Sequence, residues 1–185
     1  MTQFVYLGSL FHANGGDFKD VNRRRAIALN VAGQMRRVWK SKRLPISMKI
    51  QVYITAVCSV LVYGCESWLL TRKVVQRLNG FNSQVLSWMT KNSVREEASS
   101  RTRSFDLVNW IRVRGLKFLG RVLRMEKTRP MHRLVKYKYA NRLEGDFLSD
   151  APNTDSFENL IDIAKNKTEW GQVISALKGI TIRIK

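Results

Sequence analysis

The residues of this chain that could carry out chemistry are few, and they lie apart in the sequence. Metal-dependent polymerases and nucleases hold divalent ions with clustered carboxylates. Here no Asp-Asp pair occurs, and the only adjacent acids are Glu96 and Glu97, in a polar stretch without periodicity. His12 and His132 have no cysteine or carboxylate at ligand spacing, and no nucleophile or phosphate-loop motif is present. The sequence therefore predicts no catalytic residue, metal ligand or cofactor site.

The chain has two cysteines, Cys58 and Cys65. Seven residues apart on one helix, they would lie about 10 Å from each other, too far for a disulfide. We therefore expect free thiols and an intracellular protein, nuclear or cytoplasmic rather than secreted. The N-terminus has no signal pattern, and the longest uncharged run, residues 50–65, is short for a membrane span, so we expect no membrane partner.

Positive charge is the dominant feature of the sequence. Its 185 residues include 33 Lys or Arg and 14 Asp or Glu, which gives a formal net charge of +19. Residues 21–49 hold nine bases and no acid, and residues 101–139 hold twelve bases against Asp106 and Glu126. The hydrophobic content of 44% excludes a disordered basic tail. Two one-signed tracts in a folded chain indicate a nucleic-acid partner, with a merely basic surface as the alternative.

Hydrophobic periodicity predicts a mainly α fold, a helical bundle with a short N-terminal β-hairpin and a C-terminal helical extension. Residues 4–11 alternate and lead to a turn at residues 14–16, which predicts a strand that ends in that turn. Helices are expected over about 17–39, capped by Asp17 or Asp20, and over 47–63, 71–89, 105–125, with a kink near Gly115, and 156–177. The expected division is 1–16 hairpin, 17–92 bundle, 93–104 linker, 105–140 basic helical region and 141–185 extension.

The helical wheel separates candidate core positions from candidate phosphate contacts. In the first predicted helix an apolar stripe contains Val21, Ala28 and Trp39, with Arg24 on the same side. In the fourth, Leu116, Leu119 and Leu123 share one face. The candidate nucleic-acid contacts on the opposite faces are Arg23, Arg25, Arg36, Arg37 and Lys40 in the first helix, and Lys117, Arg121 and Arg124 in the fourth.

Aromatic residues next to bases offer a second kind of contact, because nucleotide bases stack on aromatic rings. Trp39 and Trp110 lie on apolar stripes, which favours the core. Tyr137 and Tyr139 flank Lys138, and for these two the pattern leaves core and base stacking equally open.

The order of several short motifs resembles the reverse transcriptases of non-LTR (LINE-type) retrotransposons. Residues 4–9 (FVYLGS) are similar to the F-x-Y-L-G-S element that follows the catalytic palm in that family, and residues 25–28 (RAIA) to its R-I-x-x-A helix. Next come Trp39, Leu44-Pro45, Lys49 four residues before Tyr53, and residues 61–68 (LVYGCESW) for L-x-Y-G-x-E-x-W. Residues 114–125 (RGLKFLGRVLRM), 145–152 (GDFLSDAP) and 160–170 (LIDIAKNKTEW) are similar to the remaining motifs. Each motif is weak alone, but the ordered set is specific.

The resemblance implies the end of a palm with its primer-holding hairpin, a thumb-like bundle over 17–92, and a C-terminal extension. It adds Tyr6 and Gly8 to the candidate nucleic-acid contacts and implies a template–primer duplex of RNA or DNA as partner. The family is an RNA-directed DNA polymerase that needs Mg²⁺, but its catalytic carboxylates lie upstream of these motifs. We therefore expect this chain alone to be inactive and to bind no small-molecule substrate. A domesticated binding module or a non-functional transposable-element remnant is the alternative.

Three positions depart from the family pattern. Arg121 replaces the His of G-H-x-x-R, which removes any role for a neutral imidazole but retains a possible phosphate contact. Gly115 replaces the second Arg of R-R-L and is expected to loosen its helix. Asn166-Lys167 stands where Asp-Arg is common, with the expected loss of an ion pair.

Overall fold

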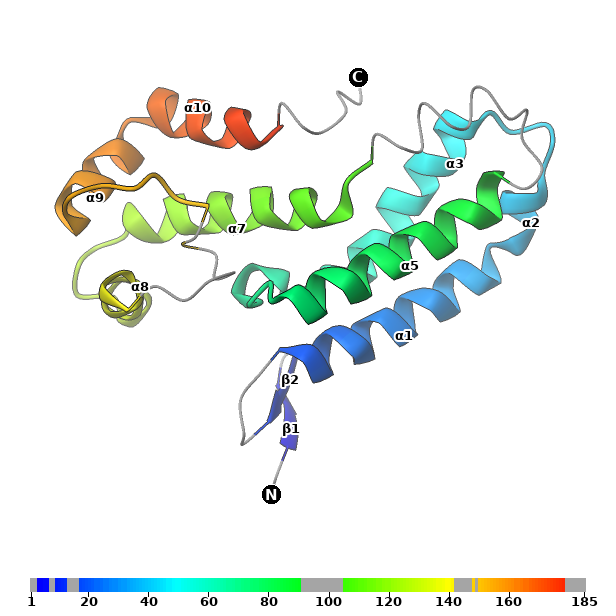
Figure 1. Ribbon diagram of the computed structural model, residues 1–185, viewed down its shortest axis with the longest axis horizontal. Helices are drawn as coiled ribbons and strands as arrows, with labels where there is room; N and C mark the ends of the chain where they lie inside the picture. The colour runs from blue at the N-terminus through cyan, green and yellow to red at the C-terminus, as the bar shows by residue number, and fades with distance from the viewer. Residues whose placement is uncertain are drawn as a thin grey trace. The chain divides into compact units, whose positions relative to one another are not determined.

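The computed structural model describes residues 3–6, 9–12, 17–90, 105–141, 148 and 150–178. It is mainly α-helical, which confirms the predicted fold class (Figure 1). The chain forms two compact units. Unit 1 comprises Met1–Gly64 and Arg72–Val108, and unit 2 comprises Cys65–Thr71 and Asn109–Lys185. The predicted basic region and C-terminal extension therefore fall largely within one unit, where they share a hydrophobic core.

The N-terminal residues form a hairpin of two short strands, β1 (Gln3–Tyr6) and β2 (Ser9–His12). The strands are antiparallel, with Phe4 opposite Phe11. The expected single strand over residues 4–11 is wrong, because the apolar alternation runs through both strands and does not mark where the chain reverses. The predicted turn at residues 14–16 lies outside the described residues. The backbone N–H of Leu10 donates to Asp20 Oδ1 over 2.9 Å, which ties β2 to the first helix.

The predicted first helix is two helices, α1 (Phe18–Gln34) and α2 (Arg36–Lys40), separated at Met35. Asp17 occupies the N-cap position of α1, but its side chain makes no capping hydrogen bond. Val21, Ala28 and Ala32 are buried, as the apolar stripe predicted. The Trp39 indole is also buried and donates to the Ala32 carbonyl over 2.7 Å. This bond holds α2 against the end of α1.

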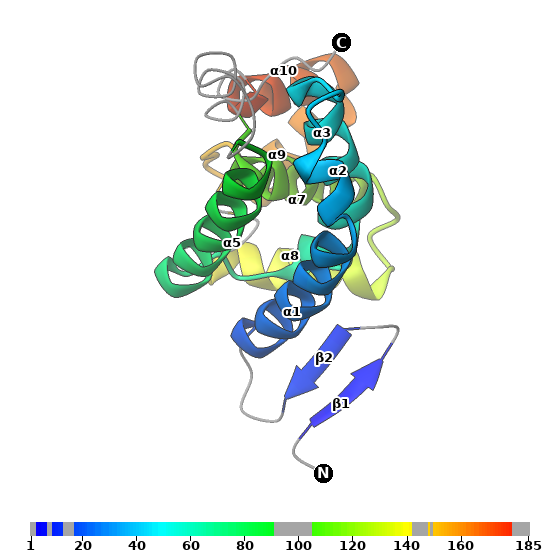
Figure 2. The same ribbon diagram turned by 90° about the vertical axis from the view of Figure 1, so that its right-hand side faces the viewer.

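The second predicted helix consists of α3 (Ile46–Val52), a π-helical segment (Tyr53–Cys58) and α4 (Ser59–Leu61). Gly64 follows with φ +75°, the left-handed conformation expected of a glycine after a helix. The helix packs against α1 and α5 (Arg72–Thr90), which lie side by side in Figures 1 and 2. It is not enclosed on all sides, because its small polar residues form an exposed face: Gln51, Thr55 and Ser59.

Two polar networks cross the core of unit 1. Lys49 is 1% exposed, and its Nζ donates to the Trp39 carbonyl over 3.0 Å at the end of α2. Tyr53 Oη donates to Asn82 Oδ1 over 2.9 Å, and Asn82 Nδ2 donates to the Phe105 carbonyl over 3.1 Å. Burial lowers the pKa of Lys49 and raises that of Tyr53. The Lys49 and Tyr53 positions of the family resemblance therefore have structural roles.

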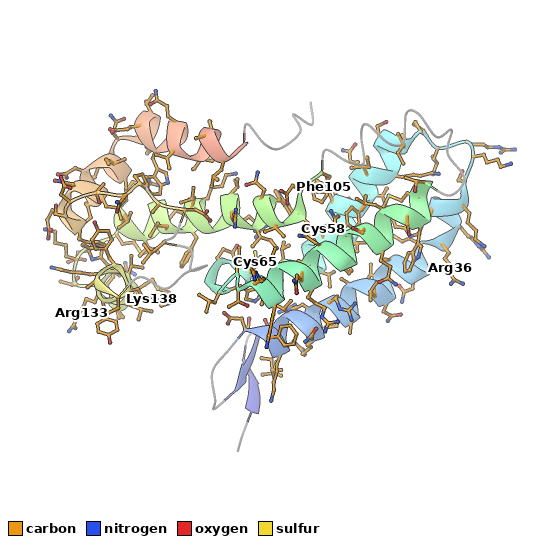
Figure 3. The ribbon with its side chains drawn as sticks, in the orientation of Figure 1. Arg36, Cys58, Cys65, Phe105, Arg133 and Lys138 are labelled. Atoms are coloured by element: carbon orange, nitrogen blue, oxygen red, sulfur yellow. The ribbon has the colours of Figure 1, made fainter. Side chains whose placement is uncertain are left out.

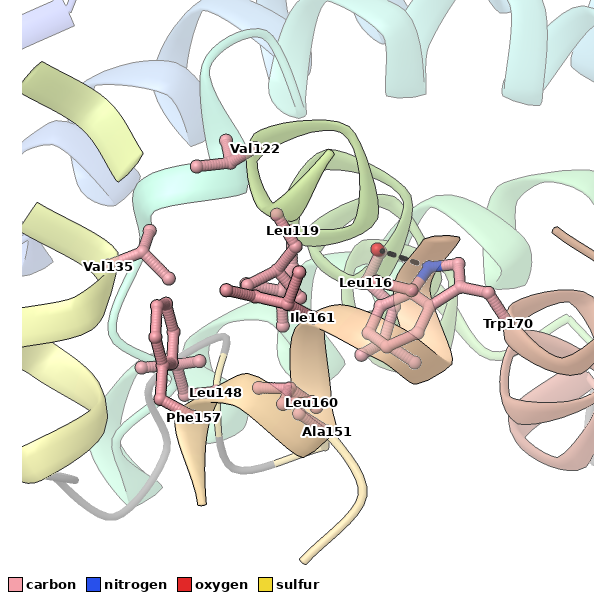
Figure 4. Packing of buried hydrophobic residues seen from close by; sticks show 12 residues of the cluster. Leu116, Leu119, Val122, Val135, Leu148, Ala151, Phe157, Leu160, Ile161 and Trp170 are labelled. Atoms are coloured by element: carbon pink, nitrogen blue, oxygen red, sulfur yellow. Dashed lines mark hydrogen bonds between the residues drawn. The ribbon is translucent and has the colours of Figure 1, made fainter. Parts of the chain in front are cut away.

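Unit 2 contains a 3₁₀ turn (Cys65–Ser67) and the helices α8 (Pro130–Ala140), α9 (Phe157–Lys165) and α10 (Lys167–Lys178). Most of α7 (Leu107–Leu123) also belongs to it. Helix α7 continues through Gly115 without a break. The core of unit 2 joins these helices (Figure 4), and its largest side chains include Leu116, Leu119, Phe157, Leu160 and Trp170.

The predicted final helix over residues 156–177 is interrupted at Asn166. Ser156 caps α9 by accepting from the Asn159 N–H over 3.1 Å. Asn166 Oδ1 then accepts from the backbone N–H groups of Thr168 and Glu169 at 3.2 and 3.3 Å. The residue at which the sequence departs from the family's Asp is therefore a helix N-cap, a position that Asn and Asp fill equally well.

Candidate nucleic-acid interface

Most of the first basic tract is at the surface of unit 1, although part of it is internal. Lys49 is buried, and Arg24 is nearly so, with its guanidinium 4.7 Å from the centre of the Tyr63 ring. Arg23 Nη1 lies 3.9 Å from Asp20 Oδ1. These three cations therefore stabilise the fold or are partly neutralised, and the surface charge of the tract is smaller than its sequence count.

Helix α2 and the segment after it carry a cluster of exposed cations. We call it the α2 cluster: Arg36, Arg37, Lys40, Lys42 and Arg43. None of them forms an ion pair with another residue that the structure describes. Figure 3 shows Arg36 at one end of unit 1 with its side chain directed away from the helices. The cluster offers flexible positive charge to a polyanion, without a shaped site.

A groove of about 520 Å³ lies between α1 and α5. Arg25 from α1 and Lys73 and Arg77 from α5 line it together with Phe18, and its described lining contains no acid. We call it the α1–α5 groove. The rest of its lining comes from α5: Gln76, Gly80, Phe81 and Gln84.

The groove has the chemistry of an anion site. Arg25 Nε is buried and makes no hydrogen bond to any described residue. The Arg77 guanidinium is held 5.6 Å from the centre of the Phe18 ring, which orients it. Three cations in one concavity repel one another, and an anion with several oxygen acceptors would remove that repulsion. A phosphate group is such an anion.

Sequence reasoning identified Arg25 but missed Lys73 and Arg77. The segment 50–100 has a net charge of only +2, so a search for one-signed tracts passes over it. The signal available was helical spacing, because Lys73, Arg77, Gly80 and Gln84 recur at i, i+4, i+7 and i+11 in an exposed row beside the buried stripe of α5. These residues form a groove only because α1 packs beside α5 and contributes Phe18 and Arg25 to its lining.

The second predicted face divides into two parts. Lys117 and Arg121 are exposed on α7, as expected. Arg124 is also exposed, but its Nη1 donates to the carbonyl of Ala164 in the last turn of α9 over 2.8 Å. Arg124 therefore has a structural role that the wheel did not predict. Of the contacts implied by the resemblance, Gly8 and the Tyr6 side chain lie outside what the structure describes.

Residues from distant motifs contact one another in unit 2. Arg114 Nη2 donates to Glu66 Oε1 over 2.9 Å, which joins the L-x-Y-G-x-E-x-W and R-R-L motifs. The Trp170 indole of the tail motif donates to the Leu116 carbonyl over 3.2 Å. Trp68 is buried. These motif positions therefore pack and orient the helices of unit 2.

The remaining candidate groups offer little chemistry. Burial raises the pKa of both Cys58 and Cys65 to about 12, and neither cysteine is in a disulfide. Across the described ranges, no three His, Cys, Asp or Glu side chains gather where they could hold a metal ion. In the same ranges no helix is long and apolar enough to cross a membrane.

No protein-family model matches the chain, and the searches of curated proteins and of solved structures found no match either.

Proposed function

We propose that this chain binds the phosphate backbone of nucleic acid through unit 1, as the template–primer-binding C-terminal part of a non-LTR retrotransposon reverse transcriptase. The observation that carries the binding proposal is the α1–α5 groove. Two helices bring Arg25, Lys73 and Arg77 into one concavity whose described lining is free of acid. The exposed α2 cluster adds positive charge to the same unit.

The overall charge of unit 1 supports the same proposal. Its described part contains thirteen Lys or Arg residues and three acids. Arg24, Lys49 and one of the acids, Asp20, are buried, which leaves eleven bases and two acids at or near the surface. A folded surface with so few acids repels itself and attracts a polyanion. Phosphate contacts carry no sequence information, so binding of this kind is indifferent to base sequence.

The resemblance supplies the more specific part of the proposal. A hairpin tied to a basic helical unit is the arrangement expected for the end of a palm and a thumb, and the motif residues of unit 2 contact one another rather than remaining scattered. In this role the chain holds a duplex and leaves the chemistry to carboxylates outside the 185 residues. It would act wherever the element's RNA and DNA meet, in the nucleus or the cytoplasm.

Binding of the full chain to labelled duplexes tests the first part. We expect similar affinities for unrelated sequences, for both double-stranded DNA and RNA–DNA hybrid. If four to six phosphates are neutralised, the slope of log K against log salt should be roughly −4 to −5 on B-DNA. A flat salt response, or strong preference among unrelated sequences, would contradict the proposal.

A polymerase assay tests the second part. The isolated chain should incorporate no nucleotide on a primed RNA template with Mg²⁺ or Mn²⁺, because its sequence contains no Asp-Asp pair to hold the metal ions. Nucleotide incorporation that a single substitution in this chain abolishes would show that the chain has its own active site. Such a result would overturn the assignment.

A further inference from the structure

We propose that α8 of unit 2 carries a separate site for single-stranded nucleic acid, in which Tyr137 stacks on a base and cations of the same helix contact the flanking phosphates. This inference goes beyond the proposed duplex binding of unit 1. It concerns a different unit, a different kind of contact and a different form of the ligand.

The inner face of α8 is fully engaged. His132 and Val135 are buried in the core of unit 2. The Tyr139 ring lies 5.3 Å from that of Phe157, centre to centre, and its hydroxyl donates to the Thr154 carbonyl over 2.6 Å. Tyr139 therefore belongs to the structure and is not available to a ligand.

The outer face carries large side chains that the fold does not cover. Tyr137 is 69% exposed, Leu134 48% and Met131 40%. The three recur at a spacing of three residues and form an apolar strip along the helix. Among the described residues, the Tyr137 side chain has no hydrogen bond and no ring contact. Of the two tyrosines that flank Lys138, only Tyr137 presents its ring to solvent.

The surroundings of this strip are strongly positive. Residues 127–141 contain no acid and five Lys or Arg: Lys127, Arg129, Arg133, Lys136 and Lys138. Figure 3 shows Arg133 and Lys138 on either side of α8. The ion pair of Lys136 is weak, because its Nζ lies 3.8 Å from Glu158 Oε1 and both side chains are 62% exposed. Charge complementarity therefore selects an anionic partner.

The combination of ring and charge identifies the form of the ligand. A duplex stacks its bases inside and presents mainly phosphates, so it offers no free base face on which an exposed tyrosine could stack. A single strand offers both a base face and phosphates, and proteins bind it with aromatic platforms among cations. An anionic membrane surface is the competing partner, and it would depend on Met131 and Leu134 rather than on the Tyr137 ring.

The test compares Tyr137→Ala with Tyr137→Phe in the full chain, by anisotropy of a labelled oligothymidylate and of the same strand annealed to its complement. We expect Tyr137→Ala to weaken single-strand binding by about 5- to 100-fold, the loss of one stacked base. Tyr137→Phe keeps the ring and should stay within about twofold. Neither change should alter duplex affinity. An Arg133→Gln, Lys136→Gln double variant should flatten the single-strand salt slope by about 1 to 1.5.

Two results would overturn the inference. One is an unchanged single-strand affinity in Tyr137→Ala. The other is a pair of observations. If the Met131→Ser, Leu134→Ser variant no longer binds phosphatidylserine vesicles while the Tyr137→Ala variant still binds oligothymidylate, the apolar strip contacts a membrane and not a single strand.

The same experiment separates this inference from the proposed function. Tyr137-dependent single-strand binding without duplex binding would retain the α8 site and reject the role of unit 1. Duplex binding together with an unchanged single-strand affinity in Tyr137→Ala would retain the role of unit 1 and reject the α8 site.

Discussion

The indole Nε1 of Trp170 in α10 donates to the carbonyl oxygen of Leu116 in α7, 54 residues earlier in the chain, over 3.2 Å (Figure 4). The ring lies against Gly120, one turn farther along α7. A Cβ placed at Gly120 would come within 2.8 Å of Cδ1 and Cε2 of that ring. The close approach of α10 to α7 therefore depends on the absence of a side chain at Gly120.

Gly120→Ala should destabilise the protein by about 1–3 kcal/mol, because the methyl group overpacks against a buried ring. Gly171→Ala is the matched control, since a Cβ there meets nothing within 4 Å and the substitution removes only glycine's helix penalty. The control should stabilise by up to about 1 kcal/mol. Denaturant unfolding of both variants decides the matter. A Gly120→Ala protein as stable as Gly171→Ala would contradict the packing.

Arg124 should behave differently from its two neighbours on the predicted phosphate face. Because Arg124 donates to the Ala164 carbonyl, Arg124→Ala should lower the free energy of unfolding by about 0.5–1.5 kcal/mol. Lys117→Ala and Arg121→Ala, at exposed positions on the same helix, should each change it by less than about 0.5 kcal/mol. Thermal unfolding of the three single variants measures the difference. Equal changes in the free energy of unfolding for all three variants would contradict the structural role of Arg124.

His132 should make unit 2 less stable in acid. It is 3% exposed, its Nε2 has no hydrogen-bond partner among the described residues, and its ring lies edge-on to Phe157. Burial lowers its pKa, and the charges of Lys127 and Lys136 lower it further. A lowered pKa means that the unfolded chain binds the proton first. Stability is therefore complete above about pH 6.5 and falls as the pH drops below it, by at most about 1.4 kcal/mol per pH unit.

His132→Leu should remove this dependence while keeping the site apolar. Unfolding measured between pH 7.5 and pH 5 should show a smaller loss of stability in the variant than in the unmodified protein. Identical pH profiles would show that His132 is not buried in its neutral form.

Both thiols should be unreactive in the folded protein. With a pKa of about 12, Cys58 and Cys65 are thiolate at only about one part in ten thousand at pH 8. Iodoacetamide at pH 8 should leave the native protein unlabelled over a period in which the denatured chain takes up two equivalents. Rapid labelling of the native protein at either cysteine would contradict the burial.

The sequence was sufficient to predict most of the helical segments, and in α5 most of the buried face. The spacing in α5 predicts that Val74, Val75, Leu78, Phe81, Val85 and either Trp88 or Met89 face inward. All of these are buried except Val75 and Trp88, which are half-buried. Periodicity could not predict the breaks at Met35 and Asn166. At Asn166 the chain changes direction through a side-chain cap, and such a cap leaves the apolar pattern on either side unchanged.

The candidate site was harder to predict from the sequence than the helices, because counting charges does not show which side chains are buried and which are exposed. Lys49 counts toward the positive tract, but it is buried in the core, where its ammonium group donates to the Trp39 carbonyl and is not available to a ligand. Lys73 and Arg77 lie outside both positive tracts of the sequence, and yet they line the groove. Which cations are available to a ligand depends on how α1 packs against α5, and that is a property of the tertiary structure.

The most direct test of the account is the salt dependence of duplex binding in an Arg25→Gln, Lys73→Gln, Arg77→Gln variant. A variant with Lys127, Lys165 and Lys167 changed to Gln is the charge-matched control, since these three are exposed in unit 2 and none of them lines the groove. If each groove cation contacts a phosphate, the slope of log K against log salt should be shallower by about two to three units in the groove variant and nearly unchanged in the control. Equal slopes for both variants, with circular dichroism showing intact helices, would contradict the assignment of the α1–α5 groove as the nucleic-acid site.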